Sequence, residues 1–317
     1  MISVGGLGVS LDRRESGSDI DFISHAHSDH VSAAKGSSSI LASDETVSLL
    51  MAAHGIGNVK RADSSFSLLD AGHMLGSKQL CIEDESLGGR IIYTGDFQLQ
   101  GSRAAKRIEI KEADAVILDS TYPDPSLRFG DRLEVEGDLQ AWASKFSERG
   151  IVLFGSYTMG KAQELIMLLN EIGITPVCGK RIGAINNAYR ANGIDLDCLS
   201  QNDGYEYEEL LRDNFVGIVE NSRLSALARA LAIVHDRPVF TAVATGFAKR
   251  FRFDTDAQFP LSDHADFAQS VEYIESTGAK NVYTYGKGAE EFAANLSRLG
   301  FDARPFSEMA AGMSSIR

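Results

Sequence analysis

The stretch ISHAHSDHV, residues 23–31, holds three of the seven histidines of the 317-residue chain. Its residues of metal-ligand type are His25, His27, Asp29 and His30. The preceding segment IDFIS is predicted to be a buried strand, and residues two apart on a strand project from the same face. We therefore expect His25 and His27 to point at one centre and Asp29 and His30 to face a second one. Imidazole and carboxylate ligands together suit Zn²⁺ or Mn²⁺ better than Ca²⁺ or Mg²⁺.

Two later stretches carry further ligand types at strand ends. AGHMLGS, residues 71–77, places His73 between a predicted strand and a glycine-bounded turn, and YTGDF, residues 93–97, places Asp96 at the end of an apolar strand. Alone, His73 is typical of a loop histidine and Asp96 of a turn or a helix cap. Beside the first cluster, both are predicted metal ligands, with Asp96 able to bridge two cations.

Composition bounds the class of protein. The length allows one large or two moderate domains, and 44% apolar with 24% charged residues is typical of a soluble globular enzyme. The net charge of −13 opposes non-specific coating of nucleic acid. The charge argues less strongly against a nuclease, because bound cations and a local basic groove can make the electrostatic potential positive where the substrate binds.

The expected lack of targeting signals and the use of cysteine point to the same compartment. We expect no membrane span and no signal peptide, because the sequence shows neither a long apolar run nor a basic lead before an apolar block. The three cysteines, Cys81, Cys178 and Cys198, lack CxxC spacing and are predicted to be reduced thiols. The expected location is therefore the cytoplasm.

The order of the predicted helices and strands indicates an α/β protein. Its first part reads as short strands, among them 20–27, 78–84, 90–96 and 114–120, with one helix over 44–56. Helices and strands then alternate over 132–150, 151–156, 160–173, 174–179 and 182–193. A layered sheet protein with an inserted α/β section is expected.

HxHxDH, AGHMLGS and YTGDF, in this order, resemble the signature motifs of the metallo-β-lactamase fold. Asp12, in GVSLDRR, matches the first motif of that family, an aspartate that supports the metal loop. The resemblance implies an αββα sandwich. It also implies one ion held by His25, His27 and His73, and another held by Asp29 and His30, with Asp96 bridging them.

Three further stretches resemble the β-CASP nucleases of that fold: ILDSTYPDP (117–125), GSYTMGKAQELIMLLN (155–170) and FPLSDHADF (259–267). The resemblance implies that His264 is the general acid and Asp119 its acidic partner. Chain length and the ATG of VATGFAKR are similar to short bacterial and archaeal exonucleases, either ligase-associated or related to mRNA 3′-end-processing factors. The implied domains are a metallo-β-lactamase domain over 1–125, a β-CASP domain over 126–250, and a closing metallo-β-lactamase part over 251–317.

One position departs from the family pattern. Many β-CASP nucleases complete the second metal site with a histidine, where this chain has Tyr285 in NVYTYGKGAEE. Neutral tyrosine is a poor ligand, with an ordinary pKa of about 10. The second ion is therefore expected to bind weakly, to take water at that position, or to be absent. The DNA-repair branch of the family lacks the same histidine.

The inserted section offers substrate-binding candidates. GSYTMGK fits the phosphate-loop pattern, but Ala162 follows where a Mg²⁺-binding hydroxyl is needed, which disfavours an NTPase. Ser156, Gly160 and Lys161 are candidates for holding a substrate phosphate at a helix start, although a plain strand–helix turn is equally consistent. Lys249 and Arg250 in FAKRFRF are candidates for gripping a nucleic-acid backbone, with a solvated surface turn as the alternative.

The predicted function is a metal-dependent hydrolase that cleaves phosphodiesters of single-stranded RNA or DNA by a metal-activated water, as a processing or repair exonuclease. Asp29, His264 and Asp119 are the predicted catalytic residues. The expected cofactor is one or two Zn²⁺ ions, with Mn²⁺ as an alternative, and other processing or repair proteins are expected partners. The remaining alternatives are a nucleic-acid-binding subunit without activity and a small-molecule hydrolase. His54 and His235 are predicted to be structural.

Overall fold

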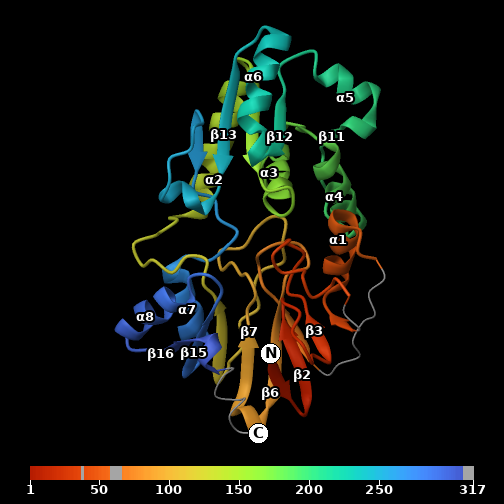
Figure 1. Ribbon diagram of the computed structural model, residues 1–317. Coiled ribbons are helices and arrows are strands. Elements are labelled where there is room, and N and C mark those ends of the chain that lie inside the picture. The colour runs from red at the N-terminus through yellow and green to blue at the C-terminus, as the bar shows by residue number, and fades with distance from the viewer. Residues whose placement is uncertain (37–38, 58–65, 310–317) are drawn as a thin grey trace. The chain divides into compact units, whose positions relative to one another are not determined.

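The computed structural model describes residues 1–36, 39–57 and 66–309. Within them the chain forms three sheets with helices between and beside the strands, which confirms the α/β class (Figure 1). The chain divides into two compact units. The first comprises Met1–Arg128 and His264–Arg317, and the second comprises Phe129–Asp263. The second unit therefore interrupts the first along the chain.

A four-stranded sheet opens the first unit. Its order is β1 (Ile2–Val4), β2 (Leu7–Leu11), β3 (Ile20–Phe22) and β4 (Ile40–Leu41). The β1–β2 pair is antiparallel, and the other pairs are parallel. Helix α1 (Asp44–His54) follows β4, begins where the Ser43 hydroxyl accepts from the Thr46 N–H, and ends at Gly55 in the left-handed conformation with φ +67°.

A six-stranded sheet completes the first unit. Its order is β16 (Asp302–Pro305), β15 (Asn281–Tyr285), β8 (Ala115–Asp119), β7 (Gly89–Tyr93), β6 (Lys78–Asp84) and β5 (Ser67–Asp70). β5, β6 and β7 are antiparallel, and β7, β8, β15 and β16 are parallel. The β8–β15 pair joins strands on either side of the second unit in sequence.

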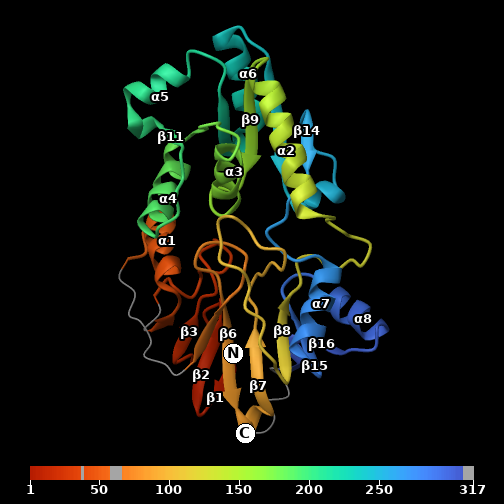
Figure 2. The same ribbon diagram turned by 180° about the vertical axis from the view of Figure 1, so that it is seen from behind.

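Alternation along the strands gives this sheet two apolar faces. Leu80, Ile91 and Ile117 pack with Leu11 and Phe22 of the four-stranded sheet. Their neighbours, Cys81, Ile92 and Val116, pack beneath α7 (Phe267–Thr277) and α8 (Ala289–Arg298). Both views show these two helices beside β15 and β16 (Figures 1 and 2). The two sheets therefore share one core, and helices cover the outer face of the larger sheet.

The second unit is a parallel sheet with helices. Its order is β11 (Leu199–Ser200), β10 (Val177–Cys178), β12 (Val216–Glu220), β9 (Ile151–Ser156), β13 (Val239–Ala244) and β14 (Ala257–Phe259). The helices are α2 (Arg132–Ser147), α3 (Lys161–Asn170), α4 (Lys180–Ala191), α5 (Tyr205–Leu210) and α6 (Leu224–His235). This alternation confirms the helix–strand pattern predicted over 132–193.

Two boundaries differ from expectation. The second unit runs to Asp263, past the end expected at 250, because β14 adds to the sheet in parallel with β13. The strand expected over 20–27 ends at Phe22, since beyond it the Ser24 N–H donates to the Asp12 carboxylate and not to a neighbouring strand. No helix in the part of the chain that the structure describes is long and apolar enough to cross a membrane.

Candidate metal centre

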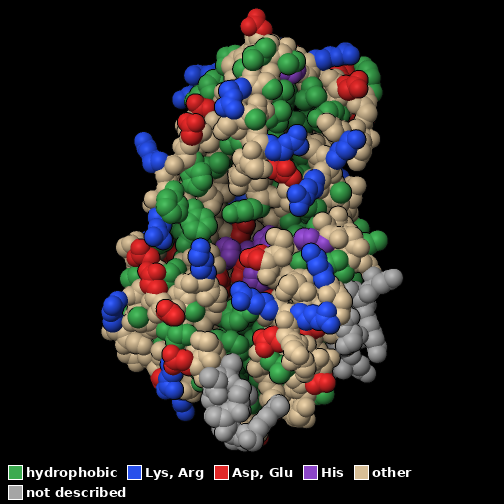
Figure 3. Space-filling model, in the orientation of Figure 1, with side chains coloured by type: hydrophobic (Ala, Val, Ile, Leu, Met, Phe, Trp, Pro, Cys, Tyr) green, Lys and Arg blue, Asp and Glu red, His purple; other side chains and the backbone are tan. Residues whose placement is uncertain are grey.

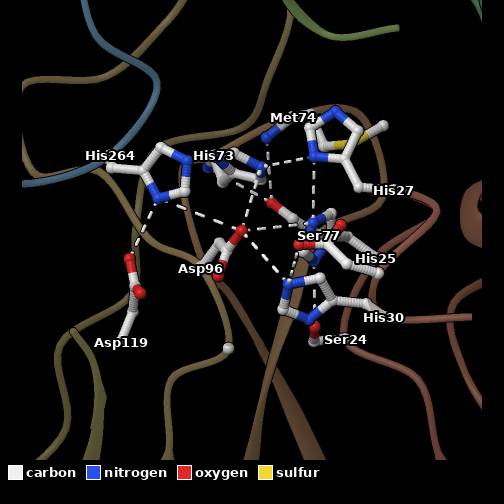
Figure 4. A network of polar contacts seen from close by, with 12 residues as sticks. Ser24, His25, His27, His30, His73, Met74, Ser77, Asp96, Asp119 and His264 are labelled. Carbon is white, nitrogen blue, oxygen red and sulfur yellow. Dashed lines mark hydrogen bonds and ion pairs between the residues drawn. The ribbon is translucent and has the colours of Figure 1, made fainter. Parts of the chain in front are cut away.

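The candidate ligands come from loops that follow strands of the first unit. The loop after β3 carries His25, His27 and His30, the turn between β5 and β6 carries His73, and Asp96 lies just beyond β7. Figure 4 shows their side chains turned toward one another around Asp96, with His264 and Asp119 on one side. The structure thus brings together residues from three separate sequence motifs.

Four of these side chains meet at one point. The Nδ1 atom of His27 lies 3.1 Å from Nε2 of His25 and 3.1 Å from Nε2 of His73. Asp96 Oδ2 lies 3.4 Å from His25 Nε2 and 3.8 Å from His73 Nε2. One ligand atom from each of the four residues lies within 4.8 Å of all the others, and His25, His73 and Asp96 are buried.

The spacing of these atoms fits a metal ion. Zinc binds imidazole nitrogen at about 2.0–2.1 Å, so two nitrogens in a tetrahedral site lie about 3.3 Å apart. The 3.1 Å separations in the cluster are close to that value. Three nitrogens and one carboxylate oxygen can hold Zn²⁺ or a similar transition-metal ion.

Hydrogen bonds fix which imidazole nitrogens face the cluster. The Ser24 hydroxyl donates to Asp12 at 2.7 Å, so its oxygen accepts from Nδ1–H of His25 at 2.9 Å. His30 donates its Nδ1–H to Asp12 at 2.8 Å. In His25 this leaves the Nε2 lone pair directed at the cluster, as a metal ligand requires, and His30 likewise turns Nε2 inward.

Asp12 is a buried support for the metal loop. Its carboxylate accepts from the Ser24 N–H at 2.6 Å, the Ser24 hydroxyl, His30 and the Tyr93 hydroxyl at 2.7 Å. It is one of two described non-glycine residues with positive φ, at 57°. That conformation costs about 1–2 kcal/mol, which the four hydrogen bonds offset.

The electrostatics divide the histidines into two kinds. Burial, with the neighbouring imidazoles, lowers the pKa of His25 well below its ordinary value and keeps this residue neutral. Burial also opposes protonation of His30, but Asp96 and Asp12 outweigh it and raise the pKa of His30 to about 10. Burial raises the pKa of Asp96, against the influence of His30. Without a cation, one proton at His30 balances part of the carboxylate charge.

The second predicted ion has fewer ligands. His30 Nε2 lies 3.4 Å from Asp96 and 3.6 Å from Asp29, whose side chain is 79% exposed. Tyr285 donates its hydroxyl to the Leu11 carbonyl at 3.0 Å, and burial raises its pKa to about 12. It therefore braces the strand that leads to Asp12 as a neutral phenol.

His264 and Asp119 form a pair at the edge of the cluster. His264 Nδ1 lies 2.9 Å from Asp119 Oδ2 and 3.9 Å from Asp96 Oδ2. Burial opposes ionisation of Asp119, but the hydrogen bond and charge of His264 outweigh it and lower the pKa of Asp119. The carboxylate thus fixes the orientation of the imidazole through Nδ1, and Nε2 is the nitrogen that is not bonded to Asp119.

Several supporting residues were not predicted from the sequence. His54 Nε2 donates to the carbonyl of Ala26, between His25 and His27, at 2.9 Å, so this histidine holds the metal loop as well as ending α1. The Ser77 hydroxyl accepts from the backbone N–H groups of His73 and Met74, each at 3.2 Å. Tyr93 holds Asp12. The contacts of His54 and Tyr93 join residues far apart in sequence, so spacing gives no signal for them.

Tyr93→Phe is expected to weaken metal binding about tenfold to a hundredfold, because Asp12 loses one of the bonds that aim His30. Competition with a chromophoric chelator would measure the affinity. The matched control is Tyr273→Phe, since Tyr273 is also a buried phenol but donates to Gln79. An unchanged affinity in Tyr93→Phe would show that Asp12 orients His30 without the hydrogen bond from this hydroxyl.

Binding of a cation at His30 is expected to release close to one proton at pH 7. Because the pKa of His30 is raised, the protonated form predominates below about pH 10, and the cation must displace that proton. Affinity at this position should therefore rise with pH up to about 10. Calorimetric titration in two buffers of different ionisation enthalpy would count the protons. A His30→Gln variant should release none, and an equal release from that variant would assign the proton to another group.

The predicted substrate-binding residues of the second unit differ in burial and in their contacts. Ser156 is buried, and its hydroxyl meets no hydrogen-bond partner among the described residues, while Gly160 caps α3 with φ +80°. Lys161 was expected to contact a phosphate, but it is 2% exposed and paired with Glu164 and Asp263. Its charge is therefore already balanced. Lys249 and Arg250 are exposed, as a backbone contact would require.

Histidine side chains reach the surface next to acidic ones on the face drawn in Figure 3. The side chain of His264 is 21% exposed and that of His30 is 13% exposed, whereas His25 and His73 are almost fully covered. The edge of the cluster that carries His264 is thus in contact with solvent. Fold and site together define an α/β protein with a cluster of histidines and aspartates that can hold a metal ion.

Comparison with known proteins finds similarity to parts of two longer proteins. The chain is 30% identical over 299 residues to a protein of Opitutus terrae named "Probable DNA ligase", covering 90% of this chain and 28% of that protein. It is 34% identical over 83 residues to "Transcription termination factor FttA" of a Lokiarchaeum species, covering 25% of this chain and 13% of that protein. The chain thus spans less than a third of the length of either relative. The sequence matches no protein-family model.

Proposed function

We propose that this chain is a metal-dependent nuclease of the metallo-β-lactamase fold and β-CASP type, which hydrolyses phosphodiesters of single-stranded nucleic acid. The observation that carries the proposal is the meeting of His25, His27, His73 and Asp96 beside the His264–Asp119 pair. The second unit is the proposed β-CASP insertion. The names of both relatives, one referring to DNA and one to transcription, support a nucleic-acid substrate.

The proposed ligand sets divide the cluster. His25, His27 and His73 would hold one ion, Asp29 and His30 a second, and Asp96 would lie between them. When bound, divalent cations lower the pKa of a coordinated water and stabilise charge on phosphoryl oxygens. Asp12 and Tyr93 keep His30 aimed at that position, and the buried setting of His25 keeps its Nε2 unprotonated.

His264 supplies the proton of the proposed reaction. Its Nδ1 is bonded to Asp119, so Nε2 is the atom that would protonate the leaving oxygen of the cut strand. Ionised Asp119 favours the protonated imidazole and fixes its orientation. Lys249 and Arg250, which are exposed, remain proposed contacts for the strand, whereas Ser156 and Gly160 are buried as Lys161 is. The chain is proposed to act with other processing or repair proteins.

Two other functions fit the observations less well. A binding subunit without activity needs no intact ligand set, yet the residues of the HxHxDH motif converge here. Ligase activity belongs by name to a protein of which this chain spans 28%. Clustered imidazoles and carboxylates favour hydrolysis at a metal ion over the joining of ends.

Cleavage of end-labelled single strands tests the proposal. Metal-depleted protein would be reloaded with Zn²⁺ or Mn²⁺ and given matched DNA and RNA, each labelled at the 5′ or the 3′ end. We expect metal-dependent shortening that His73→Ala abolishes and His235→Ala retains, because His235 packs against Phe215 in the second unit, outside the cluster. Metal binding with no shortening of either strand would overturn the nuclease and favour the binding subunit.

A further inference from the structure

A buried cluster of five charged side chains in the second unit ends on the residue before His264. Its members are Arg132, Glu136, Lys161, Glu164 and Asp263. Arg132 Nε donates to Glu136 at 3.0 Å, and its Nη2 donates to Glu164. Lys161 Nζ donates to Glu164 at 2.6 Å and is also paired with Asp263. Arg132, at 8% exposed, is the most accessible of the first four.

Stability alone is a weak reason for such a cluster. Arg132 and Lys161 are each the first residue of a helix, α2 and α3, where the helix dipole disfavours a cation. Burying ions also carries a desolvation cost, and well-packed apolar side chains often serve stability as well or better. Fixing one geometry of the chain is the better-founded role for a buried ion network.

The cluster fixes the position of the two residues that precede His264 in the chain. Arg132 Nη1 donates to the carbonyl of Ser262 at 2.8 Å, and Lys161 holds the side chain of Asp263. Beyond His264, Gln98 Nε2 donates to the His264 carbonyl at 3.0 Å, and the Ala265 N–H donates to Phe97 at 2.8 Å. The main chain is therefore held on both sides of the histidine.

We propose that Arg132 and Lys161 are positioning residues, which hold Ser262 and Asp263 so that His264 meets Asp119 through Nδ1 and presents Nε2 to the leaving oxygen. The contact of His264 with Asp119 is a matter of geometry alone, whereas the role of Nε2 in the reaction rests on the proposed function. Neither cation touches the reacting atoms, so both act through the main chain next to His264.

The effect of Arg132 and Lys161 on the His264–Asp119 contact can be tested without measuring activity. In metal-free protein with ¹⁵N-labelled histidine, the Nδ1–H bonded to Asp119 should give an imidazole signal that Asp119→Ala removes. Lys161→Met should weaken or shift this signal, and Lys161→Arg should retain it. The matched control is Arg190→Met, because Arg190 also holds backbone carbonyls of the second unit, those of Leu196 at 2.9 Å and Cys198 at 3.0 Å.

The effect of Lys161 on proton transfer from His264 is tested by changing the leaving group of the substrate. Departure of p-nitrophenolate needs no proton, so a nucleoside p-nitrophenyl phosphodiester bypasses the general acid. Lys161→Met should lower kcat on nucleic acid at least about tenfold, part of the 10²–10⁴ that a general acid contributes, with KM unchanged. Its rate on the p-nitrophenyl ester should stay within about threefold, because that reaction uses no general acid. Lys161→Arg should recover most of the loss.

The outcomes separate the proposals. An unchanged His264 signal in Lys161→Met, or equal losses on the two substrates, would overturn the positioning role. If the unaltered protein cuts neither substrate, the proposed function fails, while the signal still decides whether Lys161 holds His264. Asp263→Asn keeps the side-chain shape while removing its charge, and it tests the same link if Lys161→Met does not fold.

Discussion

Replacing Asp96 with asparagine is expected to lower the rate of the proposed phosphodiester cleavage at least about a thousandfold. Asp96 faces three histidines of the cluster, with Oδ2 3.4 Å from both His25 and His30 and 3.8 Å from His73. A catalytic cation contributes several kcal/mol of transition-state stabilisation, and each 1.36 kcal/mol corresponds to a tenfold rate. An amide keeps the shape but removes the charge, and its NH₂ group cannot be a ligand.

Metal content and rate should be measured together on Asp96→Asn. Asp114→Asn is the matched control, because Asp114 is a carboxylate of the same sheet that accepts from the Arg90 N–H, away from the cluster. We expect the first variant to bind fewer ions or to bind them more weakly, and the second to match the unaltered protein. Full activity in Asp96→Asn would remove this residue from the ligand set.

His264→Asn is expected to lower kcat on nucleic acid by about 10²–10⁴, the usual contribution of a general acid. The loss should be largest for substrates with poor leaving groups, because an alkoxide leaves slowly unless it is protonated. On a p-nitrophenyl ester, the same variant should retain most of its rate. Asparagine retains a polar contact for Asp119, so the ordering of that carboxylate is largely preserved.

Rates of the variant on both substrates, taken beside its metal content, decide this prediction. Equal losses on both would mean that His264 contributes through the cation and not through a proton, since its Nδ1 lies 3.9 Å from Asp96. Gln98→Ala is a useful companion, because it removes the hydrogen bond to the His264 carbonyl and leaves the imidazole in place. We expect that variant to show the same substrate dependence in a weaker form.

The ligands could be predicted from the sequence because their motifs are local. HxHxDH places three imidazoles within one loop, and His73 and Asp96 each follow a recognisable apolar strand. Their supports could not be predicted in this way. Tyr93 lies 81 positions from Asp12, and Gln98 lies 166 positions from His264. Those pairs arise only once the sheets have packed.

Lys161 shows how a local pattern can mislead. GxxxxGK places a lysine at a helix start, where a phosphate is favoured. In the structure Glu164, one turn along the same helix, and Asp263, far along the chain, neutralise that lysine. Burial decided between the two roles, and burial is a property of the folded unit that sequence spacing does not report.

The place of the second unit in the chain has a consequence for the order of assembly. His25, His27, His73 and Asp96 all precede it, whereas His264 follows it. During synthesis, roughly ten to thirty seconds separate Asp96 from His264 at ordinary rates of elongation. The proposed metal ligands are therefore synthesised before the proposed general acid. We expect the proposed hydrolysis to be absent until translation has passed the second unit, because β15 and α7 of the first unit also follow it.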